Sequence, residues 1–123
     1  VKGFDISTIP QEVSFLSHFN SKSTEGASGE FIKKYTEKFG ADSLSQFGAA
    51  AYDCVYAIYG AMKEAGDKIS VTSSPSDICN ALKDVFNGGY TYSGVTGTNI
   101  KWTAEGFVSK TALKYIVKES DAK

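Results

Sequence analysis

The sequence predicts an α/β fold whose sheet is too small to stand alone. Amphipathic segments with helix start and stop signals occupy the middle of the chain, between one β-like run near the N-terminus and others near the C-terminus. Helices of α/β proteins bury one face against a sheet, and such a sheet needs more strands than this chain offers. We therefore expect the 123 residues to be one segment of a larger α/β protein.

The composition is that of a folded protein, and it does not indicate a strongly charged partner such as nucleic acid or an anionic membrane. Hydrophobic residues make up 41% and aromatic residues 13% of the chain, which is enough for a core. The net charge is only -1, so the chain lacks the basic surface that binds nucleic acid or an anionic membrane. Every basic residue is Lys, so the bidentate grip that Arg gives on phosphate or carboxylate is missing. The first ten residues contain no signal-peptide pattern and no apolar run long enough to span a membrane.

The first expected element is a strand over Gln11–Phe19 (QEVSFLSHF). Its residues alternate between two sides, with Phe15 and Ser17 on one and Leu16 and His18 on the other. This period of two is typical of a strand in a sheet.

The first helix is expected over Ser28–Phe39, after a polar stretch rich in Gly and Ser. Phe31, Ile32 and Tyr35 recur at helical spacing, and Gly40 ends the pattern.

The second helix is the best bracketed element and covers the run SQFGAAAYDCVYAIYGAMKEAG, residues 45–66. Ser43 followed by Gln46 predicts a capping box at its start, and Gly66 predicts its C-cap. Apolar residues follow one side of the helix, so we expect most of it to be buried. These residues are Phe47, Ala51, Val55, Ile58 and Met62.

The third helix is expected from Ser74, its N-cap, to about Phe86, with Pro75 and Asp77 in its first turn. A terminal hairpin follows: residues 98–103 alternate, residues 104–106 turn, and residues 111–117 form a β-rich run. The expected organisation is thus a strand region (1–19), a helical cover (20–88), a hairpin with a last strand (89–117) and a solvated tail (118–123).

The two cysteines, Cys54 and Cys79, lack the paired spacing of a zinc site or redox motif. Two alternatives stay open: a pair of buried thiols, or a disulfide between neighbouring helices.

The ordered motifs resemble the type I periplasmic or extracellular solute-binding proteins of ABC transporters, above all the group that binds branched-chain amino acids. The resemblance covers about residues 11–117, with Cys54 in place of the usual Ala and Trp102 in place of the usual Phe. The motifs are GEFIKKYTEKFG (29–40), FGAAAYDCVYAIYGAMKEAG (47–66), ICNALKDV (78–85), YSGVTGTNIKWTAEGFV (92–108) and YIV (115–117).

The resemblance implies that this segment is the C-terminal third of a two-lobed type I periplasmic-binding-protein fold. The strand at 11–19 would precede a hinge crossing, the helices would cover one lobe, and the hairpin would return towards the other. The whole protein would bind a small molecule, such as an amino acid, between lobes that close about the hinge. It would deliver the ligand to a membrane permease from the periplasm or the cell surface, there as a lipoprotein, and would need no cofactor.

Two other readings remain open: a ligand-sensing ectodomain of a signalling receptor, and a small stand-alone interaction domain. An enzyme is not expected, because the sequence offers no nucleophile with a base, no carboxylate pair and no phosphate loop.

The resemblance suggests ligand contacts at the start of the second helix. Phe47 matches an aromatic position that faces the ligand's side chain, although core packing is an alternative. Gln46 has the chemistry to donate to a carboxylate, although helix capping would also explain it. His18, at the cleft end of the first strand, is a further candidate, although a surface or hinge hydrogen bond is the favoured explanation; no partner residues indicate a metal. Asp53, in mid-helix, is expected either to anchor a neighbouring loop or to face outward.

The faces that would meet the missing sheet are expected to be apolar. Exposed apolar patches tend to be covered by self-association, so we expect a dimer or strand exchange of this segment in solution.

Overall fold

The computed structural model describes residues 6–9 and 11–117 of the chain, so the expected tail at 118–123 lies outside the described residues. A short 3-10 helix, η1 (Ile6–Thr8), precedes strand β1 (Ser14–Ser17). Helices α1 (Gly26–Phe39), α2 (Gln46–Ala65) and α3 (Pro75–Asn87) follow, with 3-10 turns η2 (Ala41–Ser43) and η3 (Gly66–Lys68) between them. Strands β2 (Lys101–Trp102), β3 (Val108–Ser109) and β4 (Leu113–Ile116) complete the described chain.

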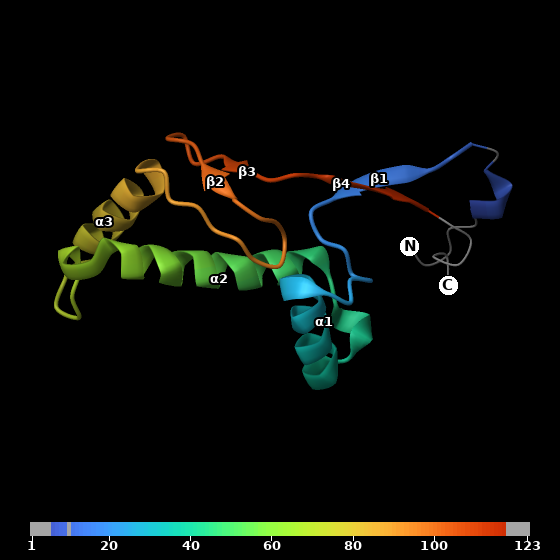
Figure 1. Ribbon diagram of the computed structural model, residues 1–123, viewed down its shortest axis with the longest axis horizontal. Coiled ribbons are helices and arrows are strands. Elements are labelled where there is room, and N and C mark those ends of the chain that lie inside the picture. Colours follow the sequence, from blue (N-terminus) through green and yellow to red (C-terminus); the bar gives the residue numbers. More distant parts are fainter. Residues whose placement is uncertain (1–5, 10, 118–123) are drawn as a thin grey trace.

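The molecule is elongated and is organised along helix α2 (Figure 1). Helix α1 lies at the N-terminal end of α2 and α3 packs near its C-terminal end, while the β2/β3 hairpin lies above it (Figure 1). The ladder of β1 and β4 projects beyond the N-terminal end of α2 (Figure 1). The expected mixed α/β organisation, with a strand before three helices and a hairpin after them, is confirmed.

The strands form two separate antiparallel pairs, and neither makes a larger sheet. Strand β1 pairs with β4, from Ser14 opposite Ile116 to Ser17 opposite Leu113. Strand β2 pairs with β3 across the expected turn at residues 104–106. An isolated antiparallel bridge between Tyr92 and Ile100 lies directly before β2. The strand expected over residues 11–19 is therefore confirmed in its centre but is shorter.

Two of the helix boundaries differ from expectation. Helix α1 begins at Gly26, before the expected Ser28, and no side chain caps it. Helix α2 is capped by Ser45, whose hydroxyl accepts from the Gly48 amide at 3.2 Å, so the capping box at Ser43 is wrong. Ser43 instead donates to carbonyls at the end of α1 and beginning of η2. The helix ends at the expected Gly66.

Helix α3 starts as the sequence predicts. The Ser74 hydroxyl accepts from the Asp77 amide at 3.2 Å and donates to the Asp77 carboxylate at 2.7 Å, with Pro75 in the first turn. This reciprocal cap satisfies an orphan donor of the helix end.

The core is small and lies at two ends of α2. At the N-terminal end, Phe19, Phe31, Ala49 and Val95 form a buried cluster, against which Ile32, Tyr35 and Leu44 pack. At the other end, the rings of Phe86, Tyr90 and Trp102 contact one another between α3 and the hairpin, with centroids 4.8 to 6.1 Å apart. Ile100 is the only large side chain of the described residues that is fully buried.

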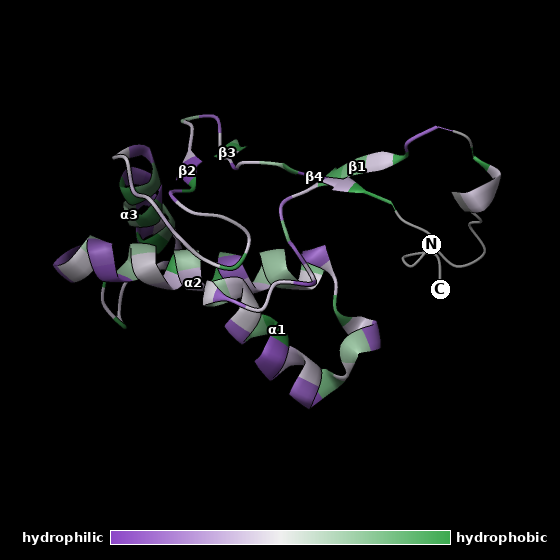
Figure 2. Ribbon diagram, turned by 45° about the vertical axis from the view of Figure 1, so that its right-hand side comes forward, coloured by the Kyte–Doolittle hydropathy of each residue, from purple (hydrophilic) through white to green (hydrophobic). Residues whose placement is uncertain are grey.

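Helix α2 does not bury the face that the sequence predicts. Its buried stripe consists of Ala49, Asp53, Ala57, Ala61 and Ala65. The expected core face is solvent-exposed, with Phe47 at 75%, Val55 at 66% and Ile58 at 46% of their full exposure. Figure 2 shows hydrophobic segments along much of α2 and on both strands of the β1/β4 ladder. The expectation of a mostly buried helix is wrong for this chain, because nothing within its described residues covers that face.

Candidate functional site

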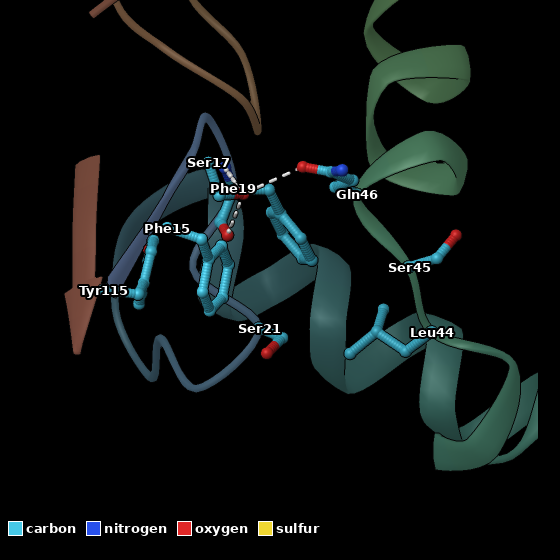
Figure 3. A pocket seen from close by; sticks show the side chains of 8 residues that line it. All are labelled: Phe15, Ser17, Phe19, Ser21, Leu44, Ser45, Gln46 and Tyr115. Carbon is cyan, nitrogen blue, oxygen red and sulfur yellow. Dashed lines mark hydrogen bonds between the residues drawn. The ribbon is translucent and has the colours of Figure 1, made fainter. Parts of the chain in front are cut away.

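A pocket of about 230 Å³ lies between the β1/β4 ladder and the first turn of α2. Its wall combines aromatic rings, hydroxyls and one amide (Figure 3). The lining residues are Phe15, Ser17, Phe19, Ser21, Leu44, Ser45, Gln46 and Tyr115. A concave site with apolar walls and a few convergent polar groups is the usual form of a small-molecule site, and this one is smaller than the roughly 300–1,000 Å³ of pockets for drug-sized ligands.

The two ends of the described chain build one wall of the pocket. Because side chains alternate along β1, Phe15 and Ser17 lie on the same face of the ladder. The register places Tyr115 directly opposite Phe15, and their rings stack with centroids 5.4 Å apart and planes 22° apart. Such a stacked pair presents a flat apolar surface on which the hydrocarbon part of a ligand can pack.

Helix α2 supplies the opposite wall. Gln46 is its first residue, and Figure 3 shows its side chain extending from the helix start towards Ser17. The Ser17 hydroxyl accepts from the Phe19 amide at 3.2 Å and donates to Oε1 of Gln46 at 3.0 Å. This contact joins the strand to the helix and leaves the Nε2 donors of Gln46 available to a ligand.

Tyr115 carries an unsatisfied polar group at this site. Its hydroxyl is buried and has no hydrogen-bond partner in the described part of the chain. Burial raises the pKa of Tyr115 above its ordinary value, so the group stays protonated and can donate. An unpaired buried hydroxyl costs about 1–3 kcal/mol, and a ligand acceptor placed within reach would recover that cost.

The start of α2 adds a favourable field for an anion. The first amides of a helix have no partner within the helix, and the Ser45 hydroxyl accepts only from the Gly48 amide. The aligned peptide dipoles of this 20-residue helix place partial positive charge at the same end. Since no Asp, Glu or Lys lines the pocket, these amides, Gln46 and the hydroxyls of the wall are its means of holding a carboxylate.

The three residues expected to bind ligand do not converge. Gln46 lines the pocket, but Phe47 points elsewhere, is 75% exposed and neither lines the pocket nor packs in the core of this chain. His18 does not line the pocket either: Nδ1 of its ring lies 3.2 Å from the Thr111 carbonyl oxygen. His18 therefore makes a surface hydrogen bond, which was the alternative to a ligand contact.

Apart from Gln46, none of the pocket residues, among them Ser17, Ser45 and Tyr115, was expected from the sequence as a site residue. The alternation of residues 11–19 contained the signal for Ser17, because it shares a side with Phe15. Tyr115 has no such signal, since it joins the site only through pairing with a strand about 100 residues away.

Asp53 anchors a loop, which was one of the two roles expected from the sequence. Its carboxylate accepts from the amides of Val95 and Thr96 at 2.8 and 2.7 Å, from the Thr96 hydroxyl at 2.6 Å and from the Tyr92 hydroxyl at 3.2 Å. Lys110 donates to the same Thr96 hydroxyl at 2.6 Å. Burial, then the negative charge of Asp53, raise the pKa of Tyr92 well above its usual range. The buried charge is thus fully hydrogen-bonded, which fits a structural role.

The cysteines fit neither alternative offered by the sequence. Cys54 and Cys79 are both free and both exposed, because each lies on the solvent side of its helix. Across residues 6–9 and 11–117, no group of three or more His, Cys, Asp or Glu side chains is arranged to hold a metal ion. Among the same residues, no helix has the length and apolar character needed to cross a bilayer.

Comparisons with known proteins identify no relative of this chain. No family model matches the chain, and no curated protein or solved structure is significantly similar to it.

Proposed function

We propose that this chain is the C-terminal part of a solute-binding protein of an ABC importer, and that its pocket is part of the wall of the ligand cleft. In the proposal the ligand is an amino acid, with branched-chain amino acids the first candidates. Recognition occurs by closure of two lobes and involves no covalent step. A membrane permease is the partner, and the periplasm or cell surface is the compartment.

The pocket between β1 and the start of α2 is the observation that carries the proposal. It brings Gln46 together with the Phe15–Tyr115 stack, so a polar end and an apolar wall face one small volume. An α-carboxylate suits the Nε2 donors of Gln46 and the first amides of α2. An aliphatic side chain suits the aromatic wall, where excluding water from its surface stabilises binding by about 25 cal/mol per Å².

The exposed face of α2 also supports the proposal. A lobe helix of an α/β protein packs its apolar face on a sheet, and the apolar face of α2 faces solvent here. The remaining strands of a lobe would cover this face.

The direct test is isothermal titration calorimetry of the whole polypeptide that contains this segment, with a panel of amino acids. We expect one class to bind, and we expect Gln46→Ala to weaken that binding by about tenfold or more, the loss of one hydrogen bond to a charged group. Gln11→Ala, which alters an exposed Gln outside the pocket, is the matched control and should leave affinity unchanged. Equal affinity of the Gln46 variant and wild type would remove the pocket from the proposal, and the absence of any binding amino acid would refute the ligand class.

A ligand-sensing ectodomain would use the same pocket and give the same titration. Loss of amino-acid uptake on deletion of the gene separates the importer from the sensor, which would leave uptake intact.

A further inference from the structure

The surface of this chain is far larger than its mass requires. It exposes 9023 Å², whereas a globular monomer of 13.2 kDa exposes about 6,400 Å². The excess, about 2,600 Å², is well above the roughly 800 Å² that each partner contributes to a standard stable interface. The chain therefore has ample surface to form an interface with another chain.

Strand β1 is the part of that surface best suited to pairing. It has β4 on one side only, so its other edge is free among the described residues. Natural sheets protect such edges with charged residues, prolines or bulges. The four residues Ser14–Ser17 have none of these, and Phe15 and Leu16 are 56% and 70% exposed. By contrast, β4 carries Lys114, which pairs with Glu12 at 2.8 Å.

The hydrogen-bond parity of β1 identifies the groups on its free edge. The Val117 amide donates to the Val13 carbonyl at 2.9 Å, so Val13 belongs to a hydrogen-bonded pair with β4. Because such pairs alternate along an antiparallel ladder, Phe15 and Ser17 also bond towards β4. The N–H and C=O groups of Ser14 and Leu16 therefore point to the free edge.

We propose that the free edge of β1 pairs with β1 of a second copy of this chain, antiparallel about a two-fold axis that passes beside Phe15. Ser14 of each copy then faces Leu16 of the other as a hydrogen-bonded pair, which uses the free groups of both edges. The two Phe15 side chains meet as the central non-hydrogen-bonded pair on one face of the sheet. The result is a four-stranded sheet, β4–β1–β1–β4, in place of two isolated pairs.

The composition of β1 is compatible with this register. Ser14–Ser17 carries no charged side chain, so like charges do not face each other along the paired edge. Three or more strands are needed for a sheet that is stable in water, which the two-stranded ladder does not reach alone. The inference concerns the 123-residue chain and does not depend on the proposed function.

Cysteine cross-linking tests both the dimer and its register. In a Cys54→Ser, Cys79→Ser background, Phe15→Cys places two thiols on the axis, where Cα atoms of a non-hydrogen-bonded pair lie about 4.5 Å apart, within the reach of a disulfide. Leu16→Cys is the matched control, because it is the adjacent and more exposed residue but lies opposite Ser14 of the other copy. We expect mild oxidation to link most of the Phe15→Cys chains and few of the Leu16→Cys chains. Preferential linking at Leu16, or equal linking at both, would overturn the register.

Sedimentation of the untagged chain at tens of micromolar, without any ligand, tests the association independently of the cysteines. We expect a dimer for wild type and a monomer for Leu16→Pro, which removes an outward N–H but no bond of the β1/β4 ladder. Circular dichroism of Leu16→Pro checks that its helices remain. A wild-type monomer, or a Leu16→Pro dimer of undiminished stability, would overturn the proposal. Neither result bears on amino-acid binding, so the two proposals fail separately.

Discussion

The two long faces of helix α2 reverse the usual relation between hydrophobicity and burial. One face buries Asp53 among four alanines, and the other exposes Phe47, Val55 and Ile58. The buried face has partners within the chain, namely α3 and the loop at residues 92–97, whereas the apolar face has none among the described residues. Burial in this molecule is therefore decided by which partner is present, and less by which side chains are most apolar.

Removing the buried charge is expected to have the largest effect on the difference between the two faces. Asp53→Ala should lower the free energy of unfolding by about 3–5 kcal/mol, because it leaves the amides of Val95 and Thr96 buried and unpaired. Urea denaturation followed by circular dichroism measures this. Asp42→Ala, at an exposed position, should change stability by less than about 0.5 kcal/mol. A similar small loss for Asp53→Ala would show that the loop anchor is not a support of the fold.

The second test makes the same substitution on each face. Ala61→Leu inserts a large side chain at a position with no exposure and should destabilise the chain by about 1–3 kcal/mol through overpacking against its neighbours. Ala51→Leu, on the exposed side of the same helix, should be neutral within about 0.5 kcal/mol. Thermal unfolding of the two variants side by side gives the contrast, and equal losses would mean that the outer face is covered.

The Tyr92 hydroxyl gives a pH-dependent test of the buried face. Since the pKa of Tyr92 is raised in the fold by burial and by Asp53, the unfolded chain releases this proton at lower pH than the folded chain does. Its contribution is complete below pH about 10, the ordinary tyrosine pKa, and falls as pH rises beyond that. Tyr92→Phe should cost about 1 kcal/mol at neutral pH and show a shallower loss of stability as pH rises above about 10. Identical alkaline slopes for variant and wild type would contradict the raised pKa of Tyr92 in the fold.

The smallest effect is expected on the apolar face. Val55→Ser should change the unfolding free energy of the isolated chain by less than about 0.5 kcal/mol, because the side chain is already 66% exposed. In the whole polypeptide of the proposed receptor, the same change should cost several times more, since a sheet would cover the residue. Denaturation of both proteins provides the comparison, and equal small costs would argue against a covering sheet.

The sequence predicted local structure better than tertiary placement, for physical reasons. The caps at Ser74 and Gly66 and the turn at residues 104–106 depend on backbone conformation and hydrogen bonds among adjacent residues, so they can be predicted from short stretches of sequence. The face of α2 could not be predicted, because periodicity identifies the apolar side of a helix without showing whether anything lies against it. The anchoring of Asp53 was one of two alternatives, and only the position of the loop decided between them.

The pocket shows the same division. Gln46 was predicted from the resemblance and from its place at a helix start, but its neighbours Ser17 and Tyr115 come from strands whose pairing spans almost the whole described chain. Such long-range register leaves no local pattern, so the partner of Phe15 was not visible in the sequence.

The pairing of β1 with β4 also sets an order of events in time. Contacts between residues about 100 positions apart require closure of a long loop, whereas α2 and α3 form from local contacts. We therefore expect the ladder to form after the helices and to open before them. Amide hydrogen exchange should then be fast at Tyr115 and slow at Ala57 and Ala61. The pocket would be assembled last, and it would be lost by fraying of one short strand while the helical part of the molecule stays folded.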